Sequence, residues 1–411
     1  MVLTRRAFQA KNLFHLIFLF VFSAVVLEIF SFLALVVLKE LFLVSYKPVR
    51  SQSLSESHQK ILASVLTNQF SYFIPSATLG WAIRPNGSTN LYRANSYGLR
   101  ADRDYDFFPS PGVIRIAAFG DSHVHGDEVT NENTWEERLV KLKPNLEVLN
   151  FGVGGYGFDQ AYLRYQKEGV AFHPQIVLIG FASENIYRVV NTFRPFYSPD
   201  DGLPFSKPRF LIDKSDLKLL ENPLAHLSDY EYFLKNEQEV LEQLGRHDYY
   251  YQMKYREGKF DFFSFMKLAK ILKFQIGKRF LKGGILRDGV FQNAAYNSDS
   301  EAFEVTKRIM ERFYHEVIQN GSLPVIVFLP TRDDAFRFYK RNEKIYSPLV
   351  AFCEEKGYRY VDLTNGLRTI KRFESVSELF KGHYSELGNK FIANYLGTYL
   401  EGEGLIAPDA E

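Results

Sequence analysis

The sequence contains very little cysteine and almost no net charge. Its 411 residues include a single cysteine, Cys353, which excludes an intramolecular disulfide and a zinc site built from several cysteines. The 50 Lys and Arg residues nearly balance 48 Asp and Glu, so the general basic character of nucleic-acid-binding proteins is missing. Internal repeats and low-complexity tracts are also missing, and with 46% hydrophobic residues the chain is not globally disordered.

One long apolar run is present near the N-terminus. Residues 16–38 read LIFLFVFSAVVLEIFSFLALVVL, with Glu28 as the only charge. As a helix the run would be about 34 Å long, enough to cross a hydrocarbon core of about 30 Å. It is longer than the apolar core of a signal peptide and no small-residue cleavage site follows it. We therefore predict a transmembrane anchor over residues 13–45.

The charges that flank this run predict its orientation. Three basic residues precede it, Arg5, Arg6 and Lys11, whereas the basic residue that follows it has an acidic neighbour. The positive-inside rule then leaves residues 1–12 in the cytoplasm and sends the rest of the chain across the membrane. In a bacterium this predicts a single-pass protein of the inner membrane with a periplasmic or other extracytoplasmic domain.

A lead-in segment, 46–110, precedes a region in which short apolar runs alternate with amphipathic segments. The predicted strands are residues 113–119, 146–151, 176–181, 325–329 and 358–363. The predicted helices are residues 135–142, 158–168, 302–319, 347–356 and 386–400. This alternation indicates a mainly parallel five-stranded sheet covered by helices on both faces. We assign it to one domain, 111–405, with an insertion at about 193–300.

The insertion contains a basic amphipathic stretch at residues 260–281. On a helical wheel its lysines fall on one side and its Phe, Leu and Ile residues on the other; these lysines are Lys267, Lys270, Lys273 and Lys278. Such a helix packs its apolar stripe on the protein core, lies on anionic lipid, or forms a basic rim that meets an acidic glycan. The sequence leaves these interpretations open.

Candidate reactive residues follow the predicted strands. Ser122 comes directly after the first strand, where ligands bind in parallel sheets, and a helix starting there would direct N–H groups at an oxyanion. The glycine-rich segment 152–157 follows the second strand and leaves backbone N–H groups free to donate. Asn185 follows the third strand, and His383 lies just before the last helix, from which it could reach Ser122.

These blocks resemble the SGNH (GDSL-type) hydrolase superfamily, over roughly residues 113–190 and 320–400. The resemblance implies a three-layer α/β/α, flavodoxin-like fold. It also implies that Ser122 in FGDSHVHGDEV is the nucleophile and His383 the base. Gly154 (or its neighbour Gly155) and Asn185 would form the oxyanion hole with the N–H of Ser122. The preceding segments LGWAIRPN and NSYGLR are similar to those of membrane-anchored, envelope-facing members.

The sequence departs from the family pattern in two places. The family usually has an aspartate two or three residues before the histidine, where this chain has Lys381 and Phe380. We expect Glu378 to orient His383 instead, with Asp362 or a backbone carbonyl as alternatives. In the third block Asn185 is followed by isoleucine rather than aspartate, so Glu184 is an alternative for the matching position.

Other polar residues near the blocks have less specific roles. His123, His125 and Asp127 have a spacing that could bind zinc, yet no further ligand cluster is visible, so we expect them to line the pocket mouth. We assign Asp121 and Arg332 to substrate binding, Arg332 as a grip on an anionic sugar or else a solvated loop charge. No metal or other cofactor is expected.

The resemblance and the predicted topology together imply ester chemistry outside the cytoplasm. We expect a serine esterase or O-acyltransferase that acts on acyl esters, acetyl above all, of a cell-envelope or exported polysaccharide, and that works with polysaccharide-biosynthesis proteins. Two alternatives are a lipid-directed esterase and a non-catalytic scaffold that binds glycan. The departures at Phe380 and Lys381 favour the scaffold.

Overall fold

The computed structural model describes residues 2–42, 44, 46, 54–67, 72–199, 202–214, 216–280, 289–292 and 294–408. Of the predicted features, Met1, Leu281 and the side chains of 2–12, Lys273 and Lys278 lie outside the described part.

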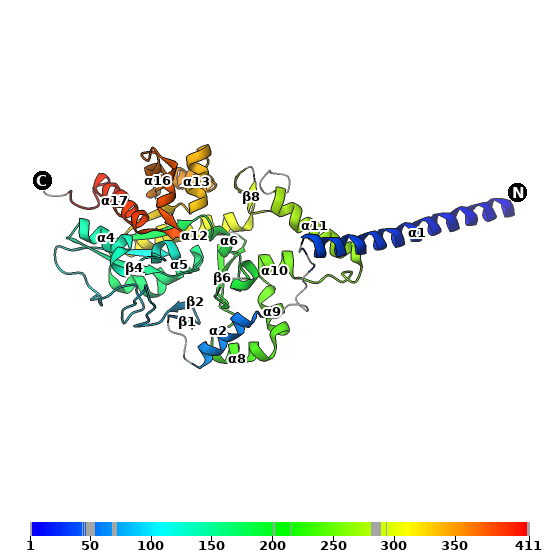
Figure 1. Ribbon diagram of the computed structural model, residues 1–411, viewed down its shortest axis with the longest axis horizontal. Coiled ribbons are helices and arrows are strands. Elements are labelled where there is room, and N and C mark those ends of the chain that lie inside the picture. Colours follow the sequence, from blue (N-terminus) through cyan, green and yellow to red (C-terminus); the bar gives the residue numbers. More distant parts are fainter. Residues whose placement is uncertain are drawn as a thin grey trace.

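A five-stranded sheet forms the centre of the molecule (Figure 1). Its strands are β3 (Ile114–Gly120), β4 (Leu146–Gly152), β5 (Ile176–Ala182), β10 (Leu323–Leu329) and β11 (Tyr360–Asp362). Their order is β11-β10-β5-β3-β4, and every neighbouring pair is parallel. In chain order this is 2-1-3-4-5, the flavodoxin-like arrangement. The predicted fold class is confirmed, and the sheet is parallel throughout.

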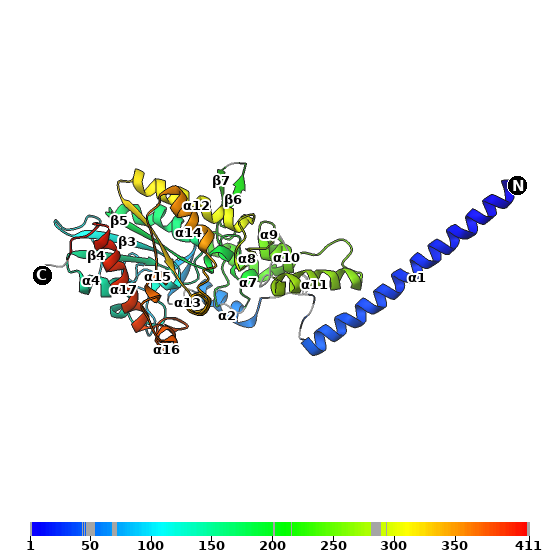
Figure 2. The ribbon, with the colours of Figure 1, turned by 90° about the horizontal axis from the view of Figure 1, so that it is seen from above.

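Helices cover both faces of the sheet because each strand is apolar on both sides. Along β3, Ala117 and Phe119 belong to one buried cluster while Ile116 and Ala118 belong to the other, as the two-residue period of a strand requires. Figure 2 shows the three layers from above. The helices of one layer are α5 (Phe158–Arg164), α12 (Glu301–Gln319) and α14 (Ser347–Lys356). The other layer contains α4 (Trp135–Leu142), α13 (Arg332–Arg341) and α17 (Glu386–Gly402).

The predicted elements agree with the observed ones to within two residues at most ends. The clearest difference is at α5, which was expected to reach residue 168 and ends at Arg164. The chain continues there as a π-helical turn over Tyr165–Gly169. Gly169 explains the change, because a Cβ at that position would lie 2.3 Å from the Phe119 ring. The π-helical turn therefore lies close against β3 and stands where the last turn of the α-helix was expected.

The lead-in segment packs against the loops that follow the strands. It consists of α2 (Glu56–Leu66) and a hairpin of β1 (Phe73–Ser76) and β2 (Gly80–Ile83). The indole N–H of Trp81, a fully buried side chain, donates to the carbonyl of Gly154 at 3.0 Å. The lead-in segment thus supports the glycine-rich loop after β4.

Between β5 and α12 the chain leaves the alternating pattern. Its helices there are α6 (Asn185–Arg188), α7 (Arg194–Tyr197), α8 (Leu227–Lys235), α9 (Glu237–Gly245), α10 (Tyr249–Lys254) and α11 (Ser264–Phe280). Two hairpins, β6 (Arg209–Asp213) with β7 (Asp216–Leu220) and β8 (Phe291–Gln292) with β9 (Ala295–Tyr296), complete it. The helix expected from residue 260 begins at Ser264, because a turn closed by Asp261 N–H and the Gly258 carbonyl precedes it.

The N-terminal helix α1 (Val2–Phe42) extends away from the sheet and contacts α11 (Figures 1 and 2). Residues 13–42 of α1 form a stretch that is long and apolar enough to cross a membrane. Most of the side chains in this stretch are exposed.

A buried ion pair between Lys207 and Asp159 joins the insertion to α5, and both side chains are almost fully buried. We expect Lys207→Met to lower the free energy of unfolding by about 3–5 kcal/mol, because Asp159 would stay buried without its cation. Combining it with Asp159→Leu should restore most of that loss. Urea unfolding of the full chain in detergent measures both, and equal stability of the two variants would contradict this account.

Candidate active site

Ser122 lies in a tight turn at the carboxyl end of β3. Gly120 ends the strand, Asp121 caps the following helix, and Ser122 is the first residue of the one-turn helix α3 (Ser122–His125). A Cβ at Gly120 would lie 2.3 Å from the Val124 side chain, so glycine is needed for the helix to fold back this closely. The turn places Ser122 at the edge where parallel sheets bind ligands.

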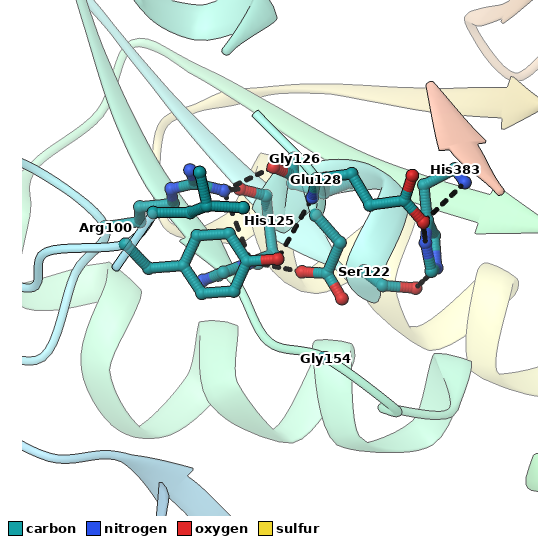
Figure 3. Close-up of polar contacts among 12 residues, drawn as sticks. Arg100, Ser122, His125, Gly126, Glu128, Gly154 and His383 are labelled. Carbon is teal, nitrogen blue, oxygen red and sulfur yellow. Dashed lines mark hydrogen bonds and ion pairs between the residues drawn. The ribbon is translucent and has the colours of Figure 1, made fainter. Parts of the chain in front are cut away.

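His383 approaches Ser122 from the opposite end of the sequence. The hairpin of β12 (Phe380–Lys381) and β13 (His383–Tyr384) carries the histidine, and Tyr384 Oη donates to the carbonyl of Pro330 at 2.6 Å. The Nε2 of His383 lies 2.9 Å from the Ser122 Oγ (Figure 3). This is hydrogen-bond distance, at which a neutral imidazole can accept the serine proton.

The acid beside His383 is Glu128 rather than Glu378. The Glu128 Oε1 lies 3.3 Å from His383 Nδ1 and also accepts the His383 backbone N–H at 3.3 Å. Glu378 ends α16 (Phe373–Glu378), where its carbonyl accepts the Ser385 hydroxyl at 2.6 Å. The expectation for Glu378 was wrong because it assumed that the acid and the base share one segment. Asp362, the alternative, is bound instead by Lys344 and Tyr346.

Two left-handed residues allow Glu128 to approach His383. Glu128 itself has a φ of +73°, and Gly382 has a φ of +96°. A Cβ at Gly382 would lie 2.3 Å from the Glu128 Oε1 and would displace that carboxylate, and the positive φ of Gly382 also favours glycine there. In the sequence, this contact is indicated by Glu128 in the segment HGDEV together with Gly382, the glycine before His383.

Arg100 binds the loop that carries Glu128. This buried guanidinium donates to the carbonyl of His125 at 2.6 Å and also to the carbonyls of Gly126 and Val129. Figure 3 shows Arg100 reaching this loop from the side opposite His383. A lead-in residue thereby fixes the turn that follows Ser122.

His125 belongs to a buried network rather than to the pocket mouth, whereas the Asp127 side chain that it contacts is 23% exposed. The Nε2 of His125 lies 2.6 Å from the hydroxyl of Tyr72, and Nδ1 lies 2.5 Å from the Asp127 carboxylate. Burial, reinforced by the nearby Arg100, lowers the pKa of His125 to about 4, so the ring is neutral at physiological pH. The expectation that His125 lines the mouth was wrong, because its side chain is fully buried.

Asp121 supports the site from inside the protein. Its carboxylate accepts from the N–H of His123 at 2.9 Å and from Arg188 at 3.0 Å, and its side chain is 2% exposed. Burial opposes the charge of Asp121, but His123 and Arg188 outweigh it and keep its pKa below the ordinary range. The same carboxylate raises the pKa of His123 against the effect of burial. Asp121 has no surface left for substrate, so its assignment to substrate binding was wrong.

Asn185 lies at the expected strand end, but its amide group is already bonded. Its Nδ2 donates to Asp121 at 2.9 Å and to the carbonyl of Tyr156 at 3.3 Å. An amide nitrogen has two hydrogens, so neither is left for an oxyanion in this arrangement. Glu184, the alternative for the matching position, instead pairs with Arg188 at 2.5 Å.

Backbone groups remain as candidates for the oxyanion hole. Within the described ranges, the N–H groups of Ser122, Gly154 and the alternative Gly155 donate no hydrogen bond to the protein. A Cβ at Gly154 would lie 3.6 Å from Asp127, so the glycine loop passes close to the loop after α3. The Ser122 N–H also begins a helix, where negative charge is favoured.

Arg332 begins α13, at the same edge of the sheet as Ser122. Its side chain is exposed and lies over the Phe336 ring, 5.2 Å from the centroid. This placement fits both interpretations made from the sequence, a contact for an anionic sugar and a solvated charge.

Comparisons with known proteins give one consistent kind of neighbour. No protein-family model and no curated protein matches the chain. Among solved structures it is similar to a lipase/acylhydrolase from Enterococcus faecalis, with 12% identity, a TM-score of 0.37 and coverage of 73% of this chain and 100% of that one.

Two further structures are similar to the same degree. An acetyl xylan esterase has 11% identity, a TM-score of 0.36 and coverage of 70% and 100%. A GDSL-like lipase from Bacteroides thetaiotaomicron has 10% identity, a TM-score of 0.33 and coverage of 72% and 91%. Similarity this weak does not assign an activity, which therefore rests on the contacts of Ser122 and His383.

The contact between Glu128 and His383 predicts a specific loss of reactivity. Glu128→Gln should slow acylation of Ser122 by about 10²- to 10⁴-fold, because the imidazolium would lose its carboxylate. Glu378→Gln should react at the wild-type rate. The rate of labelling by a fluorophosphonate probe measures both variants, and a larger loss in Glu378→Gln would contradict the assignment.

The neutral, buried His125 predicts an acid-sensitive fold. Below about pH 6.5 the unfolded chain takes up a proton at this histidine, whereas the folded protein takes it up only near its pKa of about 4. Its contribution is thus present above pH 6.5 and is lost as the pH falls, by about 3 kcal/mol at pH 4. The pKa of His123 is raised, so its contribution to the free energy of unfolding changes with pH in the opposite direction.

Comparison with His125→Gln isolates this effect. We expect the free energy of unfolding of the wild type to fall more steeply between pH 6.5 and pH 4 than that of the variant. Urea unfolding at several pH values measures the difference, and parallel curves would contradict the neutral state of His125.

Proposed function

We propose that this protein is a membrane-anchored serine esterase or O-acyltransferase. The observation that carries the proposal is the alignment of Ser122, His383 and Glu128, with 2.9 Å from serine oxygen to imidazole and 3.3 Å from imidazole to carboxylate. A serine becomes a nucleophile when an oriented base takes its proton, and this arrangement is the one that such chemistry requires.

The reaction begins when His383 Nε2 takes the Ser122 proton and Ser122 Oγ attacks the carbonyl carbon of an ester. Glu128 stabilises the imidazolium that forms. The N–H groups of Ser122 and Gly154 donate to the developing oxyanion, each contributing about 3 kcal/mol to the rate. His383 then protonates the leaving alcohol, and an acyl-serine remains.

The acyl group leaves by the reverse sequence. His383 removes a proton from water or from a sugar hydroxyl, which attacks the acyl-serine carbonyl and restores Ser122. Water gives hydrolysis and a sugar hydroxyl gives transfer. Both use the same residues, so the identity of the acceptor distinguishes an esterase from an acyltransferase.

The proposed substrate is an acyl ester, acetyl above all, of an envelope or exported polysaccharide. Support comes from α1, which would tether the catalytic domain, 111–405, to the bacterial inner membrane with residues 1–12 in the cytoplasm. A tethered hydrolase on the outer side meets polysaccharide during export. The proteins that assemble such a polysaccharide are the proposed partners.

One observation favours a second candidate, a lipid-directed esterase. Helix α11 lies beside α1, and large apolar side chains near it are exposed, among them Phe260 at 60% and Phe262 at 68%. The third possibility, a scaffold without activity, requires a histidine out of reach of the serine or without a carboxylate. The distances around His383 argue against it.

A fluorophosphonate probe tests the proposed nucleophile in the full chain. We expect labelling of the wild type and no labelling of Ser122→Ala, with His383→Ala strongly reduced. Labelling of Ser122→Ala at the wild-type level would place the reactive group elsewhere, and no labelling of folded wild type would contradict the hydrolase proposal.

Substrate choice is tested separately on wild-type protein that has not been treated with the probe. Acetate release from acetylated polysaccharide, measured against release of fatty acid from lipid vesicles, distinguishes the glycan and lipid candidates. Transfer of labelled acetyl to an unacetylated glycan in the same assay would identify an acyltransferase.

A further inference from the structure

The apolar helix α1 carries one acidic residue within its apolar run, and that residue binds the start of α11. The carboxylate of Glu28 accepts the backbone N–H of Ser264 at 2.6 Å and that of Phe265 at 3.2 Å. These N–H groups have no partner inside their own helix, and a carboxylate is the favoured group at that end. Ser31, one turn further along α1, is 1% exposed, whereas most apolar side chains of α1 are exposed. Helix α11 therefore packs on α1 at this level.

The turn before α11 presents aromatic rings beside this contact. Phe260 is 60% exposed, Phe262 68% and Phe263 37%, and the ring centroids of Phe262 and Phe263 lie 4.1 Å apart. Exposed large apolar groups that gather in one place mark a surface that contacts another apolar phase. We call residues Phe260–Phe263 the aromatic tip.

The position of Glu28 along α1 places the aromatic tip at the depth of lipid. Fifteen residues separate Glu28 from Leu13, the first residue of the apolar stretch, which corresponds to about 22 Å of helix. A hydrocarbon core of about 30 Å that begins near Leu13 would end about 8 Å beyond Glu28. A carboxylate at that depth is costly unless it is bonded, and the two N–H groups of α11 supply the bonds.

Charged groups next to the aromatic tip fit the surface of the bilayer. Arg256, Glu257 and Lys259 are exposed on the chain that leads into the tip, two cations and one anion. Asp261 is bound by Lys270 and by the hydroxyl of Tyr46, which follows α1. Apolar rings with cations behind them are the pattern of a segment that enters the headgroup region of anionic lipid.

We propose that the aromatic tip inserts into the leaflet on the side of the catalytic domain, directly beside α1, and that Glu28 holds it there. The partner is the lipid bilayer, because the exposed rings of the tip directly precede the residues of α11 that bind the apolar helix α1. The domain would then be attached at two points and held in one orientation to the membrane. This inference rests on the proposed membrane span of α1.

Depth-dependent quenching of tryptophan fluorescence tests the insertion. The two native tryptophans, Trp81 and Trp135, are buried at 0% and 2% exposure, so they give a constant background. The full chain carrying Phe262→Trp is placed in vesicles of phosphatidylethanolamine and phosphatidylglycerol with acyl chains brominated at defined depths. We expect strong quenching by bromines near the headgroups.

Matched variants serve as controls for position and for the role of the carboxylate. Phe108→Trp is the negative control, because Phe108 is 69% exposed, as Phe262 is, but precedes β3 at the opposite edge of the sheet from Ser122. Phe22→Trp, at a site 57% exposed on α1, reports the span itself. Adding Glu28→Leu to Phe262→Trp should reduce the quenching several-fold, whereas Glu28→Gln, which keeps an acceptor oxygen, should retain most of it.

Each outcome separates the inference from the proposals on which it depends. Quenching at position 22 without quenching at 262 overturns the insertion and leaves the membrane span intact. No quenching at either position overturns the span. Blue-shifted, unquenched emission from the Phe262→Trp variant, together with crosslinking between copies, identifies a second protein chain as the occupant, which also overturns the proposal. Fluorophosphonate labelling of Ser122 is read in parallel and is independent of these results.

Discussion

The buried carboxylate of Asp121 is the interaction on which the site depends. It accepts the N–H of His123, the second residue of α3, and two groups from the chain after β5, Asn185 and Arg188. One anion thereby fixes the ends of two adjacent strands and the turn that carries Ser122. Against the effect of burial, His123 and Arg188 hold the pKa of Asp121 below the ordinary range, so the carboxylate is charged at physiological pH. The position of Ser122, the proposed nucleophile, follows from this anion.

The second constraint is the early end of α3. The helix stops after one turn, where Gly126 and Glu128 both have positive φ, and Arg100 binds the carbonyls that the helix leaves free. The chain then turns back toward its own start, so the nucleophile and the acid come from one short loop. The His383 hairpin has only to reach that loop. The acid, six residues after the serine, therefore does not need to lie next to the histidine in sequence.

The sequence was sufficient to predict the parts of the structure that depend on hydrophobic pattern. The five strands of the sheet are short and mainly apolar and alternate with amphipathic helices, so a mainly parallel sheet could be inferred. The end of the first strand located Ser122, and the start of the last helix located His383. Side-chain direction at those ends could not be inferred. Asp121, Asn185 and His125 were expected to face the pocket, yet their polar atoms bind groups inside the protein. Glu128 was missed because its approach depends on two left-handed residues rather than on any periodic pattern.

The lead-in segment joins α1 to the candidate active site. Tyr72 contacts His125, Tyr92 accepts the N–H of Glu128, and Trp81 binds the Gly154 carbonyl. The chain that runs from α1 thus forms part of the wall of the active site before the sheet begins. A cut of the chain between Arg100 and β3 would separate these supports from the chain that carries Ser122. A cut before Leu54 would leave the supports in place, and the contact of Glu28 with α11 would still hold the domain to α1.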